Sequence, residues 1–206
     1  MCVLIVKNKG VKMPSQNILA ACASANPHGF GIATPNGVFK TLNVDDFLSG
    51  CEKITPDTPA IIHCRYATHG SIKTENCHPF ECKDWIFAHN GVLDITPKND
   101  MTDSETAFLQ IFLPLILANG IANRNVRKVI EFVRGYGSKF AFMNKKTAKI
   151  YTFGEFADIK GAKFSNTRWQ SRMTESRPLG LYFSKADRSY YRSEAFYAQM
   201  FAATPF

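Results

Sequence analysis

An α+β domain, in which sheets and helices pack in layers, is the fold class that the sequence predicts, and three features indicate it. Short apolar or β-branched runs of the kind that form buried strands occur in both halves of the chain. Two segments with helical character, 102–118 and 123–134, lie between these runs. The chain has 206 residues, 45% of them apolar, which is enough for one large domain or one domain with an extension. Strand runs on both sides of central helices are typical of an α+β layered domain.

The first half of the chain is predicted to contain short strands and two helices. A β-branched run directly after Cys2 predicts a strand that fixes Cys2 at its end. Asn36-Gly37 between two apolar runs is a strong hairpin signal. Asn43 is the expected cap of the helix that follows it. The expected strands are 3–6, 29–34, 38–42, 60–66 and 85–88, and the expected helices are 16–24 and 44–51.

The second half is predicted to contain two helices, a hairpin and a less regular tail. Thr102 and the acidic residues after it supply a cap and a favourable first turn for a helix over 102–118. Because its interior is almost entirely apolar, we expect this helix to be buried, and we expect Pro114 to kink or split it. The other expected elements are a helix at 123–134, a hairpin of 139–143 and 149–153, a strand at 181–183 and a helix at 193–202.

Composition argues against membrane-spanning and secreted classes of protein. No run of about 18 apolar residues occurs, so no membrane span is expected. The N-terminus has no basic region followed by an apolar stretch and a small-residue cleavage site, so a cytoplasmic location is expected. The six cysteines could form three disulfides, but reduced thiols are expected in a chain of this length without a signal peptide.

The formal net charge of +8 is unevenly distributed along the chain. From residue 160 onward there are eight Lys or Arg and three Asp or Glu, a net charge of +5. A basic end can contact a nucleic acid or another polyanion, but it can equally form a solvated surface. No nucleic-acid-binding motif accompanies the charge, so nucleic acid is not indicated as a partner beyond this basic tail.

Cys2 is the first candidate for chemistry. Removal of Met1 would leave Cys2 with a thiol and a free α-amine, whose unperturbed pKa values both lie within roughly two units of neutral. An α-amine with a pKa near ~8 can accept a proton at cellular pH, so one residue could supply both nucleophile and base. Many chains begin Met-Cys without such a role, so the interpretation depends on the residues further along.

A second candidate group follows the strand expected at 60–66. Arg65 would leave the end of a buried strand, where a guanidinium is costly unless it meets an anion. Its planar fork suits a carboxylate or a phosphate, and Thr68 and His69 follow in the adjoining loop. The alternative is a strand end held by an internal ion pair.

Three further polar clusters stand between residues 76 and 105. Pro79 forces His78 to be extended in a polar turn. Asn90 offers an amide donor, and Gly91 lets its own N–H approach a ligand closely, so the pair fits an oxyanion hole. Asp103 belongs to the acidic helix start. Taken alone, Asn90-Gly91 is an ordinary Asn-Gly turn, and the acidic segment that contains Asp103 is an ordinary helix cap.

Together and in this order, the clusters resemble the class II glutamine amidotransferase domain, which belongs to the N-terminal nucleophile hydrolases. The resemblance covers about residues 2–165 and is closest to small stand-alone members. It implies two antiparallel sheets stacked between helix layers (αββα). Its motifs are Cys2, 63–70, 76–80, 89–91 and 102–105, joined by a Gly-rich early strand at 26–32 and a closing segment at 164–167.

The resemblance also implies roles for individual residues. Cys2 would be the nucleophile, and Asn90 and Gly91 would hold the oxyanion. The substrate L-glutamine would be bound by Arg65 at its α-carboxylate, with Thr68 and His69 beside it, and by Asp103 at its α-ammonium. His78 matches a position near the active site without an assigned role. No cofactor and no metal are implied.

The sequence departs from the family pattern at two places. His28 stands where many relatives have Asp, which leaves the role of that loop open. The basic, aromatic extension at 166–206 has only about 40 residues, too few for the synthase domain that many members carry. We expect it to pack on the same domain. Any ammonia acceptor would then be a separate synthase subunit or a small molecule.

Three other classes of function remain as alternatives. A different N-terminal-cysteine hydrolase, acting on γ-glutamyl or related amides, could use the same residues. A catalytically silent binding domain could retain them. A zinc or nucleic-acid module is disfavoured, because no Cys-x-x-Cys pairs occur among the candidate ligands Cys64, Cys77, His78 and Cys82.

Overall fold

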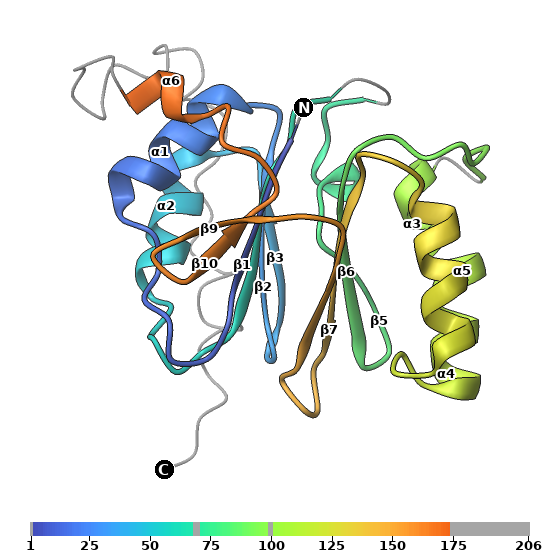
Figure 1. Cartoon of the computed structure of the whole chain (residues 1–206). Helices are drawn as coiled ribbons and strands as arrows, with labels where there is room; N and C mark the ends of the chain where they lie inside the picture. The colour runs from blue at the N-terminus through green and yellow to red at the C-terminus, as the bar shows by residue number, and fades with distance from the viewer. Residues whose placement is uncertain (1, 68–70, 99–100, 174–206) are drawn as a thin grey trace.

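Two antiparallel sheets face each other between layers of helices in the computed structural model, which describes residues 2–67, 71–98 and 101–173 (Figure 1). Helices α1 (Gln16–Ala25) and α2 (Val44–Glu52) cover the outer face of one sheet. Helices α3 (Asp103–Ala107), α4 (Leu113–Asn119) and α5 (Arg124–Arg134) cover the outer face of the other. The predicted four-layer αββα architecture is therefore confirmed.

The first sheet places the strand after Cys2 near its centre. Its six strands have the order β3-β2-β4-β1-β10-β9 and every neighbouring pair is antiparallel. Val3 lies opposite Cys64 on one side, and Ile5 lies opposite Phe164 on the other. The strands are β1 (Val3–Lys7), β2 (Phe30–Thr34), β3 (Gly37–Thr41), β4 (Ala60–Cys64), β9 (Ala157–Ile159) and β10 (Ala162–Phe164).

The second sheet has four strands in the order β5-β6-β7-β8, again antiparallel. Its central pair is long and in continuous register, from Trp85 opposite Asn144 to Asn90 opposite Lys139. This pairing brings the predicted Asn-Gly motif to the end of a buried strand. The strands are β5 (Phe80–Cys82), β6 (Trp85–Asn90), β7 (Lys139–Asn144) and β8 (Ile150–Phe153).

The helix expected over 102–118 is present, and it is divided next to Pro114, where a kink or split was expected. The segment comprises α3, a π-helical turn η2 (Phe108–Phe112) and α4. Pro114 lies in the first turn of α4, where the missing N–H of proline is tolerated. The segment is also buried on one face only, since Leu117 is 46% exposed. Thr102 caps its start as predicted, because its hydroxyl accepts the N–H of Glu105 at 3.1 Å.

The other predicted elements of the described residues are present, and several short ones were missed. The hairpin of β2 and β3 and the capping of α2 by Asn43 are confirmed. The missed elements have only three or four residues each, too few for a periodic pattern: β5, β9, β10, the 3-10 turn η1 (Thr74–Asn76) and α6 (Gln170–Met173). The strand expected at 181–183 and the helix expected at 193–202 lie outside the described residues.

The core is divided among three apolar layers. One lies between the six-stranded sheet and α1 and α2, and another between the four-stranded sheet and α3 to α5. The third lies between the sheets and includes Leu4, Val6, Ile86 and Met143. Strand β1 is buried along its whole length, so the position of Val3, its first residue, is closely fixed. Trp169, at the start of the expected extension, is also buried in the first layer.

All six cysteines are free thiols. No helix within the described residues is long and apolar enough to cross a membrane.

Candidate active site

A pocket of about 480 Å³ brings together residues from both sheets and from the loops that leave them. Cys2 and Arg65 come from the six-stranded half of the domain, and Gly91 and Asp103 come from the four-stranded half. Its size is in the range of small-molecule sites. The rest of the wall combines polar residues of 71–78 with apolar residues of 92–101. The pocket therefore contains four of the residues predicted from sequence to act on one substrate.

Cys2 lies directly before β1, and its sulfur is held by the chain that leaves β4. The N–H of Tyr66 donates to Sγ at 3.2 Å, and the Tyr66 carbonyl oxygen is 3.6 Å from the same sulfur. Burial raises the pKa of the Cys2 thiol, although the hydrogen bond from Tyr66 lowers it in part. A thiol of this kind needs a nearby base to become an effective nucleophile.

Arg65 is buried immediately after β4, as predicted, and lines the pocket. One guanidinium nitrogen donates to the carbonyl oxygen of Ser71 at 3.0 Å, which fixes the side chain from one side. A guanidinium carries five N–H donors in a planar fork, which suits a carboxylate. Thr68 and His69, which the sequence placed beside Arg65, lie outside the described residues.

Gly91 occupies a position at the pocket wall where only glycine fits. Its φ is +149°, and a Cβ there would collide with the side chain of Ser138 and lie 2.8 Å from His89 Nε2. The absence of a side chain thus leaves the backbone accessible, as the predicted oxyanion role requires.

Asn90 lies behind the pocket wall rather than among the residues that line it. It is 3% exposed, and its Nδ2 donates to the hydroxyl of Ser165 at 2.7 Å. An amide nitrogen carries two hydrogens, so this bond leaves one donor for a ligand. Its Oδ1 is buried without a hydrogen-bond partner among the described residues.

Asp103 is the first residue of α3, and its carboxylate lines the pocket. Oδ2 accepts the N–H of Leu93 at 2.9 Å, and Oδ1 accepts the N–H of Ser104 at 2.7 Å. These bonds fix the carboxylate relative to the loop that follows Gly91. A held negative charge opposite Arg65 in the same pocket suits a ligand that carries both charges.

Three histidines extend the polar surface of the pocket inward between the sheets. The ring of His78 lies 4.6 Å from that of His63 and 6.2 Å from that of His89, measured between centroids. His78 lines the pocket, and neither of its ring nitrogens has a hydrogen-bond partner among the described residues. Burial lowers the pKa of all three imidazoles, that of His63 to about 3. They are therefore neutral at physiological pH.

The tautomer of His89 follows from its neighbours. The hydroxyl of Ser104 donates to Asp103 Oδ1 at 3.0 Å, and His89 Nδ1 lies 2.9 Å from the same hydroxyl. Since the hydroxyl proton is used, Nδ1–H donates to Ser104, and His89 Nε2 carries a free lone pair near Gly91. A chain of hydrogen bonds thus links Asp103 to the pocket wall.

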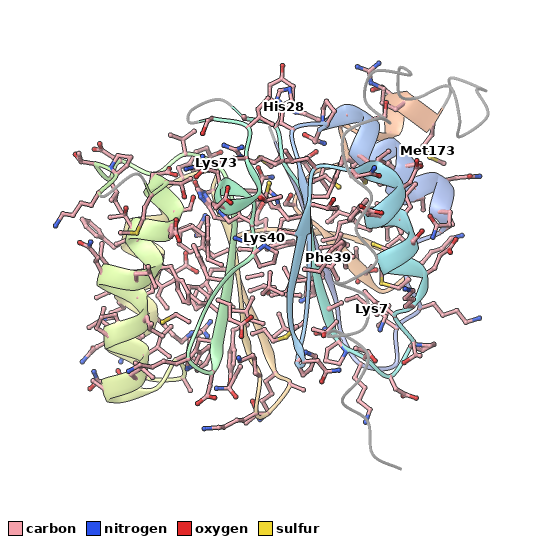
Figure 2. The ribbon with its side chains drawn as sticks, turned by 180° about the vertical axis from the view of Figure 1, so that it is seen from behind. Lys7, His28, Phe39, Lys40, Lys73 and Met173 are labelled. Carbon is pink, nitrogen blue, oxygen red and sulfur yellow. The ribbon has the colours of Figure 1, made fainter. Side chains whose placement is uncertain are left out.

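Two lysines lie in or near the site. Figure 2 shows Lys40 between the two sheets, and its ammonium lies 4.5 Å from the centre of the Phe80 ring. Lys73 lines the pocket. A positive charge near the buried imidazoles further disfavours their protonation.

Several residues of the site could not be predicted from sequence. Tyr66 and Ser104 lie inside recognised motifs but gave no separate signal. Asn166 donates from Nδ2 to the carbonyl oxygen of Cys2 at 2.8 Å across 164 residues of chain. His28, whose role was open, accepts the N–H of Ala67 at Nδ1 at 2.9 Å and so supports the chain after Arg65. The described residues contain no group of three or more potential metal ligands.

Comparison with known proteins agrees with this arrangement. The fold is similar to that of the glutamine phosphoribosylpyrophosphate (PRPP) amidotransferase from B. subtilis, solved with ADP and GMP, with a TM-score of 0.51. The match has 16% sequence identity and covers 84% of this chain and 44% of that one. At this level of identity the likeness shows the fold alone.

Sequence comparison finds a similar family over part of the chain. Residues 54–146 match the model of the family "Glutamine amidotransferases class-II". A stretch of 47 residues is 49% identical to a "Putative glutamine amidotransferase" of Haemophilus influenzae, which is 21% of this chain and 15% of that protein. The family match spans less than half of the 206 residues, and the chain spans only 15% of the length of that relative.

Proposed function

We propose that this domain hydrolyses the side-chain amide of L-glutamine to glutamate and ammonia through a thioester on Cys2, and that the ammonia passes to an acceptor. The observation that carries the proposal is the shared pocket of Cys2, Gly91, Arg65 and Asp103. It contains a nucleophile, a backbone suited to an oxyanion, and two opposite charges for an amino acid. The family implies transfer of the glutamine amide nitrogen.

Activation of the thiol is the first step. With Met1 removed, the α-amine of Cys2 takes the thiol proton, directly or through water. Burial raises the pKa of the thiol, so little thiolate exists before substrate binds and a base on the same residue is needed. The sulfur then attacks the amide carbon of glutamine. The N–H of Tyr66, 3.2 Å from Sγ, stabilises the thiolate as it forms.

Stabilisation of the tetrahedral intermediate is the second step. The Gly91 N–H and the remaining Nδ2 hydrogen of Asn90 donate to the oxyanion, and each such donor contributes about 2.7–4 kcal/mol in comparable enzymes. The C–N bond breaks as the Cys2 ammonium gives its proton to the leaving nitrogen, so ammonia leaves and the amine is restored. Water then adds to the γ-glutamyl thioester, and glutamate and the free thiol are released.

Recognition of a free amino acid requires both charges of the pocket. Arg65 binds the α-carboxylate and Asp103 binds the α-ammonium. Thr68 and His69, which lie outside the described residues, are proposed from the sequence as further contacts of the carboxylate. A planar guanidinium forms two parallel bonds to a carboxylate, which fixes its orientation. The two ends of the zwitterion thereby place the side-chain amide against Cys2.

The acceptor of ammonia is a separate subunit or a small molecule, and no cofactor takes part in glutamine hydrolysis. The free thiols fit a reducing compartment such as the cytoplasm.

Variants of Cys2 test the proposal on one purified protein. Intact mass should show loss of Met1, and the protein should release glutamate from L-glutamine. Cys2→Ala should reduce the release at least 1,000-fold, on the order of the loss when a nucleophile is removed from such machinery. Cys2→Ser should retain little activity, because a serine hydroxyl is a poorer nucleophile here.

Cys82 provides a matched control, since it is also a partly exposed free thiol but lies on β5 outside the pocket. Cys82→Ala should keep normal turnover. Full glutamate release by Cys2→Ala would overturn the assignment of the nucleophile.

A further inference from the structure

We propose that Ser165 and Asn166 are positioning residues that hold the nucleophile and the oxyanion donor in register with each other. The inference rests on the proposed glutaminase chemistry. Both residues directly follow β10, which pairs with the nucleophile strand β1. They thus reach the site from the far end of the domain sequence.

Ser165 joins the strand that follows Cys2 to Asn90, the residue directly before Gly91. Its Oγ accepts the N–H of Leu4 at 2.9 Å and the Nδ2 of Asn90 at 2.7 Å. Its own N–H donates to the carbonyl oxygen of Leu4 at 2.9 Å. A hydroxyl can donate as well as accept, so it holds the Asn90 amide in either orientation. One buried side chain therefore connects the two sheets where their catalytic groups meet.

Asn166 fixes the main chain of Cys2 itself. Its Nδ2 donates to the Cys2 carbonyl oxygen at 2.8 Å, while the Cys2 sulfur is held by Tyr66 on another side. Asn166 is fixed in turn, because its Oδ1 accepts the N–H of Arg168 at 3.2 Å and its carbonyl oxygen accepts Nε1 of Trp169 at 3.1 Å. The Trp169 ring is buried against that of Phe164, 5.2 Å away between centroids. The bond to Cys2 is thus anchored in the core.

These contacts bear on the reaction rather than on substrate capture. Arg65 donates to the carbonyl oxygen of Ser71, and Asp103 accepts hydrogen bonds from Leu93 and Ser104. None of these bonds involves residue 165 or 166. Loosening Ser165 or Asn166 should leave the zwitterion sites in place while the thiol and the oxyanion donor lose alignment. A displacement of about 1 Å at reacting groups can cost on the order of 100-fold in rate. The expected signature is a lower kcat with a nearly unchanged KM.

Ser165→Ala is the direct test, and Thr41→Val is its control. The Thr41 hydroxyl is also buried and also accepts a backbone N–H at 2.9 Å, that of Asn43, but Thr41 does not line the pocket. We expect Ser165→Ala to lower kcat by about 10- to 100-fold, with KM changed less than about threefold. Both substitutions remove a buried hydroxyl, so Thr41→Val should lower Tm about as much as Ser165→Ala does, but it should leave kcat unchanged. Ser165→Thr, which keeps the hydroxyl, should restore most of the kcat.

Asn166→Asp tests the second contact without a change of shape. It replaces a donor with a carboxylate oxygen that repels the Cys2 carbonyl, so kcat should fall about 10-fold or more. Asn125→Asp, an exposed amide-to-acid change in the first turn of α5, should be silent. These two variants also test the inference if Ser165→Ala does not fold.

The outcomes separate this inference from the proposed function. If the wild-type protein releases no glutamate and Cys2 is unreactive, the proposed function itself is wrong. If the wild type is active but Ser165→Ala and Asn166→Asp keep its kcat, only the positioning role is wrong. A rise in KM at constant kcat would also overturn it, because it would place both residues in substrate binding.

Discussion

The two halves of the domain are built from different materials and contribute different parts of the site. The six-stranded half packs mostly small and aliphatic side chains beneath its helices, such as Ala21 and Ile62, together with fewer aromatic rings, such as the stacked pair Phe30 and Phe47. The four-stranded half packs phenylalanine rings beneath the broken helix, with Phe87 and Phe140 at the centre. The first half supplies Cys2, the proposed nucleophile, and Arg65, both directly at strand ends, whereas the second supplies Gly91 and Asp103 at the two ends of a loop.

This difference indicates a division of labour. Strand β1 is buried along its length between two apolar layers, so Cys2 extends from an enclosed, well-determined strand. The proposed oxyanion and ammonium sites lie on a segment that leaves the aromatic half between β6 and α3 and is held by hydrogen bonds of Asp103 and Ser104. Under the proposed function, catalysis depends on the alignment of these two separately packed halves.

Truncating the aromatic core should produce the largest loss of stability. The ring of Phe87 lies within 4.7–5.4 Å of four other rings, measured between centroids, and is fully buried. Phe87→Ala should lower the free energy of unfolding by about 3–5 kcal/mol, since it leaves a cavity and removes ring pairs. Urea denaturation monitored by circular dichroism measures this.

Phe132→Ala in the same half is the control, because Phe132 is 87% exposed. It should change stability by no more than about 0.5 kcal/mol. Equal effects of the two substitutions would contradict the view that the rings form a supporting core for the loop that carries Gly91.

Sequence reasoning located a residue correctly where its position depends on its own chain neighbourhood. The strand ends at Cys2 and Arg65, the glycine at 91 and the capped helix start at Asp103 are local features, and the structure gathers all four in one pocket. The periodic helices and the Asn-Gly hairpin are local in the same sense.

The features that were missed depend on contacts between distant segments or on very short elements. Strand β10 has three residues and is defined by its pairing with β1, about 160 residues earlier in the chain. The contacts of Ser165 and Asn166 depend on that pairing, so no local pattern could reveal them. The placement of Asn90 behind the pocket wall likewise arises from packing between the sheets.

Arg65 comes from the six-stranded half and Asp103 from the four-stranded half. Substitutions at these two positions therefore compare how much each half contributes to the binding of one substrate. Arg65→Lys loses the planar fork and Asp103→Asn loses the counter-charge. Each should raise the KM for glutamine about 10- to 100-fold, equivalent to about 1.4–2.8 kcal/mol of binding, as expected for hydrogen bonds to charged groups. Steady-state kinetics measures this, with Arg124→Lys on the exposed start of α5 as a silent control.

The double variant Arg65→Lys/Asp103→Asn tests whether the two residues contribute independently to substrate binding. If the two residues bind opposite ends of the zwitterion independently, their effects on KM should multiply. An unchanged KM in both single variants would remove them from the substrate site.

Acid should weaken the junction between the two halves, where His63 of β4 lies beside His78 and His89 of the other half. Burial lowers the pKa of His63 to about 3, below its usual 6.5, and Arg65 and Lys40 nearby act in the same direction, whereas Asp103 beside His89 acts in the opposite one. The unfolded chain therefore binds protons below pH 6.5 that the folded protein does not. Stability is full above this pH and falls as the pH drops toward 3.

Each such histidine should contribute a slope of about 1.4 kcal/mol per pH unit to the free energy of unfolding between pH 6 and 5, above the range in which most carboxylates titrate. His63→Gln retains an amide donor for the carbonyl oxygen of His89, which His63 Nε2 contacts at 3.1 Å, but it cannot titrate. Urea unfolding at pH 7, 6 and 5 measures how the free energy of unfolding changes with pH. The slope for this variant should be smaller than that of the wild type by about 1.4 kcal/mol per pH unit, which corresponds to one proton. Identical slopes in the variant and the wild type would show that His63 is not held neutral in the folded protein. The group of His63, His78 and His89 between the sheets would then tolerate a positive charge.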